Sequence, residues 1–436
     1  MRSCHSVLPV SFLALMLAAC ASSARLPLSA GIGPNPQLPK PDRSLIPMVN
    51  VAPAKGWPTG MAPTAARGWS VAAFATGFDH PRWLYVLPNG DVLVAETNGP
   101  GEKTSGIKAW FFKLYQKKAG AAVPSANRIT LLRDRDGDGR VDTRTVLLDG
   151  LTSPFGMALV GSRLFVANSD ALVSFPYVTG DTIITAAATH VLDLPGGPIN
   201  HHWTKNLLAS PDGQQLYITV GSNSNVGEHG LEKEVDRAAI WVLDLATGAH
   251  RIFASGLRNP VGMAWEPEGS KLWTVVNERD EFGGDLVPDY LTSVQDGAFY
   301  GWPWSYYGDH VDPRPEPANP AAVATAIAPD YALGAHTASL GLAYSTGEAL
   351  PAPFREGMFV GQHGSWNRDP RSGYDVIFVP FMHGKPAGDP VTVLDGFVND
   401  RGEAWGRPVG VAVGAHGALL VADDVGNTVW RVTAIP

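Results

Sequence analysis

From residue 70 to the C-terminus, short apolar runs alternate with polar turns rich in Gly, Pro, Asn and Asp. No long stretch has the 3.6-residue period of an amphipathic helix. Short apolar runs bounded by turn residues are typical of β-strands joined by hairpins. The pattern therefore predicts an all-β domain over residues 70–436.

One sequence unit recurs along this domain: a Pro or an equivalent residue, a small apolar run, a turn and a second strand. The copies average about 61 residues, which fits a four-stranded blade with its loops. A ring of small sheets buries the faces of each sheet against its neighbours and leaves only short edges. We therefore predict a six-bladed β-propeller, since a pair of β-sandwiches explains the repeat less well. The copies begin at His80, Ser153, His202, Asn259, Ala338 and Arg407, and the one at Ala338 is degenerate.

Four glycines, Gly156, Gly262, Gly341 and Gly410, occupy one place in the unit. Inner strands crowd around the central channel of a propeller, and a residue without a side chain lets backbones approach closely. We expect the glycines at these contacts. The ends of the inner strands and their loops surround the channel mouth, so polar residues there are the functional candidates.

The chain begins like an exported protein. Arg2 precedes an apolar stretch, Val7 to Leu17, that is too short to span a bilayer as a stable helix. The stretch ends in Leu-Ala-Ala-Cys20, which resembles a bacterial lipoprotein box. We predict a signal peptide over residues 1–19, lipidation of Cys20, and a lipid anchor at the periplasmic face of the envelope. The outer membrane is favoured because Ala21, and not Asp, follows the cysteine; an ordinary signal peptide is the alternative.

Residues 20–69 are rich in proline and show little periodicity. This composition predicts an extended tether between lipid and domain. The alternative is a terminal arm packed on the domain surface, with Trp57 and Met61 as its anchors.

Composition excludes several classes of function. The formal charge of −8 is unclustered, which argues against a nucleic-acid-binding surface. The two cysteines are too few for a disulfide-rich scaffold, a four-thiolate zinc site or an iron–sulfur cluster. Nucleotide-binding glycine loops, HExxH and the haem-attachment motif CxxCH are also missing.

Several polar groups lie near the predicted channel mouth. His202, next to His201, could take a proton from a hydroxyl as a general base, or it could cap a loop. Arg258 and Arg407 could bind an anion or form salt bridges between blades. The loop from His363 to Arg368 is aromatic and basic, and suits either a planar ligand or a packed corner.

A separate acidic loop lies between two predicted strands. Its alternating carboxylates and glycines fit a Ca²⁺ loop, but Thr145 replaces the acidic residue of a complete EF-hand. A simple hairpin turn explains the loop equally well, and either reading places it away from catalysis. The carboxylates are those of Asp134, Asp136, Asp138 and Asp142.

Together the motifs SPFGMALVG, NHHWTKNL, VGSNSN, GLRNPVGMAW, YGWPWSYYG and HGSWNR resemble the glucose/sorbosone dehydrogenase family, and its sorbosone dehydrogenase-like branch most. The resemblance runs from about Gly68 to Pro436. It implies a six-bladed propeller that uses pyrroloquinoline quinone (PQQ) and Ca²⁺ to oxidise a sugar or aldehyde. Electrons would then pass to a separate cytochrome or quinone, because the chain has no haem motif.

The resemblance also implies roles for individual residues. His202 matches the catalytic base, with His201 as the fallback. Arg258 and Asn259 match the pair that contacts the reactive carbonyl region of the quinone, and Arg258 would stabilise charge there. Other positions match cofactor contacts, at Arg82, His363, Arg368 and Arg407, and backbone-carbonyl ligands of Ca²⁺, at Arg279 and Asp280, where a side-chain role of Asp280 is also possible.

This chain departs from the soluble glucose enzymes at three positions. Pro154 replaces a cofactor-contacting Gln, Val409 replaces a second arginine, and Ser222 replaces an acidic residue. These departures argue against strict glucose chemistry. Two other functions stay open: a non-catalytic, surface-tethered binding module, and a Ca²⁺-dependent lactonase-type hydrolase that would use Glu96, Asn168 and Asn277.

Overall fold

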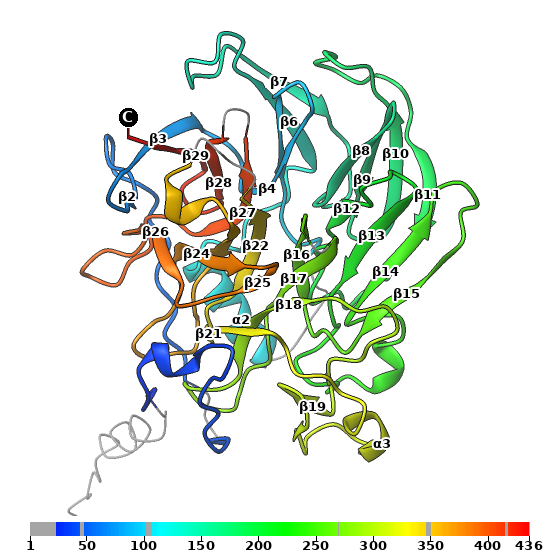
Figure 1. The fold of residues 1–436 in the computed structure, drawn as a ribbon, viewed down its shortest axis with the longest axis vertical. Helices are drawn as coiled ribbons and strands as arrows, with labels where there is room; N and C mark the ends of the chain where they lie inside the picture. Colours follow the sequence, from blue (N-terminus) through cyan, green and yellow to red (C-terminus); the bar gives the residue numbers. More distant parts are fainter. Residues whose placement is uncertain are drawn as a thin grey trace, which may run out of the picture.

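The computed structural model describes residues 23–43, 48–101, 107–268, 270–345, 350–414 and 417–435. Its apolar runs form antiparallel strands, and six of its sheets are arranged as blades around a central axis (Figure 1). The predicted six-bladed β-propeller is therefore confirmed. Each sequence copy supplies the innermost strand of one blade: β4 (Pro81–Val86), β8 (Met157–Val160), β12 (Leu207–Ala209), β16 (Pro260–Glu266), β22 (Ser339–Tyr344) and β27 (Pro408–Val413).

The other strands follow outward in each blade. Blade 1 continues with β5 (Val92–Glu96), β6 (Arg128–Arg133) and β7 (Thr143–Leu148), and blade 2 with β9 (Arg163–Ala167), β10 (Ala171–Pro176) and β11 (Thr189–Asp193). Blade 3 adds β13 (Gln215–Val220), β14 (Ala239–Asp244) and β15 (His250–Ser255), and blade 4 adds β17 (Lys271–Val276), β18 (Pro288–Ser293) and β21 (Tyr331–Ala335). Blade 5 adds β23 (Gly357–Gln362), β24 (Asp375–Met382) and β26 (Val391–Asp395), and blade 6 adds β28 (Leu419–Asp423), β29 (Thr428–Ala434) and β3 (Trp69–Thr76).

Short elements decorate the blades. The strands β19 (Ser305–Tyr306) and β20 (His310–Val311) pair with each other, and β25 (Lys385–Pro386) pairs with β24. The α-helices among the described residues are α2 (Ile107–Lys118), in the loop after β5, and α3 (Pro320–Val323). Neither is long and apolar enough to cross a membrane, and no other helix in the described part of the chain is.

The ring is closed by pairing the two ends of the domain. β3, the first long strand, pairs antiparallel with β29, the last, from Trp69 opposite Ala434 to Thr76 opposite Thr428. Blade 6 therefore contains strands from both ends of the chain. Opening the ring would break this ladder of backbone hydrogen bonds.

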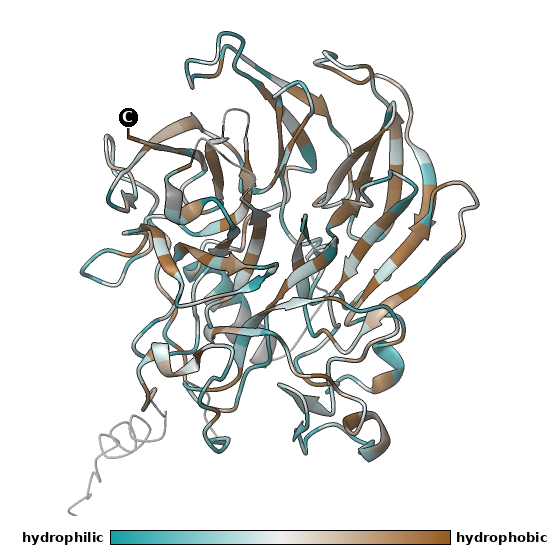
Figure 2. Ribbon diagram, viewed as in Figure 1, coloured by the Kyte–Doolittle hydropathy of each residue, from teal (hydrophilic) through white to brown (hydrophobic). Residues whose placement is uncertain are grey.

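Apolar side chains pack between neighbouring blades. Hydrophobic residues lie mainly on the strands, and hydrophilic residues are frequent in the loops (Figure 2). One buried cluster joins Trp83 of β4 to Phe155 and Met157 of blade 2. The four repeated glycines lie between inner strands, as expected. A Cβ on Gly262 would lie 2.6 Å from the backbone nitrogen of Leu342 in the next blade, and one on Gly410 would lie 2.8 Å from the carbonyl oxygen of Arg82.

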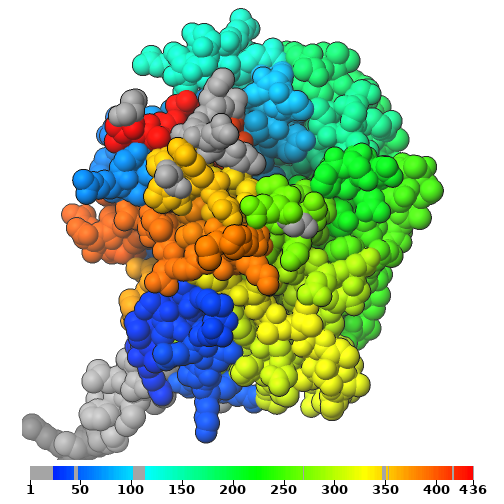
Figure 3. Space-filling view, viewed as in Figure 1, coloured from blue at the N-terminus to red at the C-terminus, as the bar shows by residue number. Residues whose placement is uncertain are grey.

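The segment before the propeller lies on its surface, where Figure 3 shows it in blue. β1 (Ile32–Gly33) pairs with β21, and β2 (Thr64–Ala65) pairs with β26. Trp57 donates to Asp423 at 2.7 Å, whereas Met61 is exposed. The extended tether is thus corrected to a packed arm over residues 23–43 and 48–69, because these backbone pairs and the Trp57 contact hold it. The predicted signal peptide and Cys20 lie outside the described residues.

Candidate active site

The strand order brings the predicted polar residues to one end of the ring. Arg82, Asn259 and Arg407 lie at the starts of inner strands, and His202 precedes one. His363 follows the second strand of its blade, as Asp280 does. Because neighbouring strands are antiparallel, the start of a first strand and the end of a second lie at the same edge. Residues from five blades therefore share one face.

His202 is held in a defined orientation. Its Nδ1 lies 2.8 Å from the carbonyl oxygen of Ser222 and 3.0 Å from the Ser222 hydroxyl. A carbonyl can only accept, so Nδ1 carries the hydrogen and Nε2 keeps its lone pair. Removal from water and the charge of Arg258 hold the pKa of His202 well below its ordinary value. His202 is therefore a neutral base near neutral pH, while His201, the fallback, is exposed.

Arg258 is buried and held by acceptors on two neighbouring loops. Its Nε and Nη2 donate to the carbonyl and side-chain oxygens of Asn225, at 3.2 and 3.0 Å. Its Nη1 donates to the carbonyl oxygens of Asn277 and Glu278, at 3.1 and 2.7 Å. Arg258 is thus a fixed positive charge. Sequence reasoning missed Asn225, although it lies in the VGSNSN motif.

Asn259 and His202 meet across a glycine. A Cβ on Gly221 would lie 2.5 Å from the Cβ of His202 and would also collide with Oδ1 of Asn259. That Oδ1 is buried and has no hydrogen-bond partner within the described structure. The absence of a side chain at Gly221 thus brings the predicted base and the predicted cofactor contact together.

Asp424 joins several predicted cofactor residues. Its Oδ2 accepts from Nη1 of Arg82 and interacts with Nε2 of His363, both at 2.9 Å, and it lies 3.4 Å from Nε2 of His80. Burial lowers the pKa of His363 to about 4 and also lowers that of His80. The neighbouring His363, His80 and Arg82 hold the pKa of Asp424 far below its usual range. Both histidines are then neutral. Sequence reasoning missed His80 and Asp424, although His80 begins the first copy of the repeat and Asp424 ends the last.

Arg407 lies close enough to lower the pKa of His363 and His80. Its Nη2 donates to the hydroxyl of Tyr374 at 2.7 Å. The Nε atoms of Arg407 and Arg82 are both buried and have no partner in the described residues. Two arginines with unused donors, balanced by one carboxylate, form a site suited to an anion.

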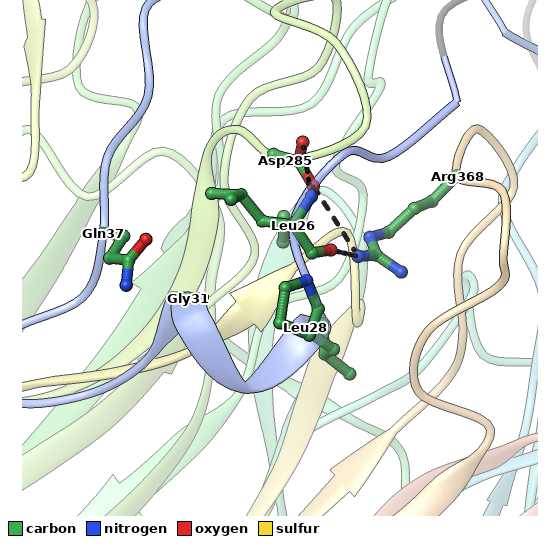
Figure 4. Close-up of a pocket in the computed structure, with 8 residues that line it drawn as sticks. Leu26, Leu28, Gly31, Gln37, Asp285 and Arg368 are labelled. Atoms are coloured by element: carbon green, nitrogen blue, oxygen red, sulfur yellow. Dashed lines mark hydrogen bonds and ion pairs between the residues drawn. The ribbon is translucent and has the colours of Figure 1, made fainter.

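Arg368 is placed differently from the other predicted cofactor residues. Its guanidinium donates to the carbonyl oxygens of Gly284, Pro370 and Leu26, and lies 3.7 Å from Asp285. Figure 4 shows Arg368, Leu26 and Asp285 around a small pocket under the N-terminal arm. Here Arg368 holds the arm, and the structure does not bring it to Asp424.

Of the two backbone carbonyls predicted to bind Ca²⁺, that of Asp280 is already bonded to other groups. The carbonyl oxygen of Asp280 accepts from Nη1 of Arg314 at 3.0 Å and from Asn225 at 3.3 Å. In the side chain of Asp280, Oδ1 accepts from Asn367 at 2.8 Å and lies 3.2 Å from Nδ1 of His336. The side chain of Arg279 is buried between Glu278 and Asp312. The positively charged guanidinium of Arg314 occupies the carbonyl oxygen of Asp280 that would bind Ca²⁺, and it would repel a divalent cation. We therefore derive no step through Ca²⁺ at this site.

The other candidate metal groups lie elsewhere. Ligand atoms of Asp134, Asp136 and Asp138 lie within 4.8 Å of one another in the loop between β6 and β7, and Asp142 accepts from the backbone of Arg135. Calcium there stays a prediction. Glu96, proposed for a lactonase metal, is buried and bonded to both Arg128 and Thr130. The structure thus gives the hydrolase reading no support.

Comparison with known proteins agrees with this fold and with the family predicted from the motifs. The TrAA12-like family model matches residues 63–288 and 311–434, and the Glucose / Sorbosone dehydrogenase model matches residues 241–364. A pyrroloquinoline quinone-dependent pyranose dehydrogenase of Coprinopsis cinerea is 23% identical over 84% of this chain. An uncharacterized protein of Borreliella burgdorferi is 28% identical over 55% of it. The chain spans 54% and 62% of these two relatives' lengths.

Solved structures show the same architecture. The holo PQQ domain of the Coprinopsis cinerea pyranose dehydrogenase superposes with a TM-score of 0.70 at 20% identity, covering 88% of this chain and 100% of that one. A calcium structure of a Trichoderma reesei enzyme of family AA12 gives 0.69 at 18% identity, covering 86% and 97%. At this level of identity the likeness supports the propeller fold.

Proposed function

The chain belongs to the TrAA12-like family, and we propose that it is an oxidoreductase that uses PQQ to oxidise a sugar or sugar-like aldehyde. Electrons would pass to a separate cytochrome or quinone. The observation that carries the proposal is the position of His202, a neutral base held by Ser222, which shares Gly221 as a neighbour with Asn259. The pyranose dehydrogenase of Coprinopsis cinerea supports the choice of cofactor and substrate class.

The described residues fit an anionic, planar cofactor. PQQ carries three carboxylates, and Arg82 and Arg407 each keep a buried Nε without a partner. Asn259 offers a buried Oδ1 without a partner. His80 and His363 are neutral, so they can form hydrogen bonds at the site without adding a further charge. Arg82, Arg407, His363 and Asn259 would therefore hold the group.

The chain itself orients the reactants and moves one proton. Nε2 of His202 accepts the proton of the substrate hydroxyl, a step that contributes roughly 10²–10⁴ in rate in enzymes of this kind. Arg258 supplies a fixed positive charge that stabilises negative charge developing nearby, and it needs no reorientation to do so. When bound, PQQ would supply the redox chemistry, as an acceptor for the hydride that leaves the substrate carbon.

We extend the proposal to the cell envelope on the strength of the lipoprotein box alone. The enzyme would be exported and anchored through Cys20 at the periplasmic face of the outer membrane. Metabolic labelling with a fatty acid tests this, since Cys20→Ser would abolish the label. Label that persists in Cys20→Ser would reject the anchor.

The function is tested by reconstitution. The metal-free apo-protein is titrated with PQQ and followed by tryptophan fluorescence, and dye reduction is then assayed with a panel of sugars. We expect His202→Ala to bind PQQ but to lose about 10²-fold or more of kcat. Arg407→Gln should weaken PQQ binding at least about tenfold, because it removes a charged donor.

The matched control is Arg251→Gln, which removes an exposed arginine paired with Asp296 and should leave PQQ binding unchanged. No binding of PQQ at micromolar concentration would reject the proposal. PQQ binding without turnover of any sugar would also reject it, in favour of a binding module. Full activity of His202→Ala would remove His202 from the mechanism.

A further inference from the structure

Ser222 lies between the two residues that carry the proposed chemistry. Its backbone N–H donates to the carbonyl oxygen of Arg258 at 2.7 Å. Its own carbonyl oxygen lies 2.8 Å from Nδ1 of His202 and 3.4 Å from the His202 backbone nitrogen. Its hydroxyl lies 3.0 Å from the same Nδ1 and donates to the carbonyl of Ser224 at 2.7 Å. Ser222 is fully buried, so these contacts fix its position.

We propose that Ser222 is a positioning residue that orients the ring of His202 and directs its unprotonated Nε2 toward the substrate, through a backbone carbonyl and without a carboxylate. The proposal rests on the proposed function, in which His202 is the base. It assigns Ser222 the part that an acidic side chain plays in many histidine bases, where the partner holds the ring and also stabilises its protonated form.

The carboxylate of Glu234 contacts this loop but is bonded to residues other than Ser222. Glu234 accepts from the backbone N–H of Asn223 at 2.7 Å and from the hydroxyl of Ser224. The hydroxyl of Ser222 donates to the carbonyl of Ser224 and not to this carboxylate. Glu234 holds the loop that carries Ser222 but does not pair with His202.

The charged and titratable groups around His202 oppose its protonation. Arg258 comes from the start of β16, Arg237 from the loop before β14, and His201 from the adjacent position, and each lowers the pKa of His202. Nζ of Lys205 lies 3.4 Å from the His202 carbonyl oxygen. With these neighbours and an uncharged Ser222, the pKa of His202 lies well below its ordinary value, so the ring is unprotonated at neutral pH. The acid limb of the rate profile should therefore lie below neutral pH.

The test compares two replacements of Ser222 that match each other in size, one charged and one uncharged. Ser222→Asp places a carboxylate beside Nδ1, and Ser222→Asn is its neutral match. An opposite charge at this range raises the pKa of a histidine by about 1–3 units. We therefore expect the acid limb of kcat/KM to move upward by about one unit or more in Ser222→Asp relative to Ser222→Asn. Identical limbs in the two variants would overturn the proposal.

A second measurement needs neither PQQ nor a sugar. Histidine-selective ¹⁵N and ¹³C NMR of the apo-protein, with His202 assigned through His202→Gln, reports the tautomer and the titration of this ring. Wild type should show a protonated Nδ1, an unprotonated Nε2 and a midpoint below 6.5. The opposite tautomer would overturn the proposal without any Ser222 variant. If no sugar were oxidised, the proposed function would fail while this measurement still decided the role of Ser222.

Discussion

At the scale of single residues, the properties of the site come from backbone groups as much as from side chains. His202 is oriented by a carbonyl, and Arg258 donates to the carbonyls of Asn225, Asn277 and Glu278. The sequence motifs identified His202 and Arg258 but not their partners. A carbonyl belongs to every residue type, so no sequence pattern marks the ones that matter.

Asp375, at the start of β24, gives a prediction about stability and pH. Burial and the nearby charge of Asp395 raise the pKa of Asp375 to about 7, and its Oδ1 has no partner in the described residues. The folded state therefore holds a proton that the unfolded chain releases near pH 4. As pH rises from about 4 to about 7, this group destabilises the fold increasingly, and above that range the cost is constant.

Asp375→Asn removes this cost. We expect the melting temperature to rise by about 2–4 °C at pH 8 and to change little at pH 4. Asp193→Asn, at an exposed position, is the control and should change little at either pH. Calorimetry at both pH values measures the difference, and an equal effect at pH 4 and pH 8 would refute the assignment to ionisation.

At the scale of elements, the repeat determines how blades meet. In four of the blades, the repeated glycine allows the next inner strand to approach within contact of its backbone. At Gly341, a Cβ would collide with the carbonyl oxygen of Val409 and lie 3.0 Å from the nitrogen of Val411. Backbone atoms cannot move aside as a flexible side chain can, so the two strands would have to separate.

Gly341→Ala should therefore destabilise the propeller by about 1–3 kcal/mol, the usual cost of overpacking. The matched control is Gly31→Ala, where the nearest atoms to a new Cβ lie at 3.8 and 3.9 Å, an ordinary contact distance. Urea unfolding of both variants measures the two costs. Equal stability of Gly341→Ala and wild type would mean that the inner strands are less tightly packed than described.

At the scale of the whole molecule, both ends of the described chain stabilise the ring. β3 completes blade 6, and the arm before it crosses to the loops of other blades. Trp57 is one of the contacts that hold the arm: its indole packs against Phe397, Trp405 and Trp430 and donates to Asp423. Removal of this ring would leave an apolar gap and a buried carboxylate with one donor fewer.

We expect Trp57→Ala to cost about 3 kcal/mol, at the low end for loss of a large aromatic side chain because the ring is only half-buried. Met61→Ala, at an exposed position in the same arm, should change stability by less than about 0.5 kcal/mol. Chemical denaturation compares the two. Similar small effects would show that the arm is held by its backbone pairs alone.

The sequence alone predicted the propeller architecture, its six inner strands and several of the polar residues that the structure brings to one face. It could do so because successive blades repeat the same alternation of apolar and polar residues and the same turn, and four of them also repeat the glycine. Each copy of this pattern is local in the chain. It also identified His202 and Arg258 through motifs. It did not decide between a tether and a packed arm, because the contacts of Trp57 are with residues more than 300 positions away.

Only the tertiary structure decided how charges from different blades combine. Asp424 meets Arg82 and His80, from the other end of the propeller sequence, as well as His363. Arg368 turns to the arm, and Arg314 occupies the carbonyl of Asp280. The Asp424 contacts depend on ring closure, and those of Arg368 and Arg314 depend on the paths of the arm and the loops. Local residue patterns carry no record of the distances between these residues, whereas electrostatics and hydrogen bonding depend on them directly.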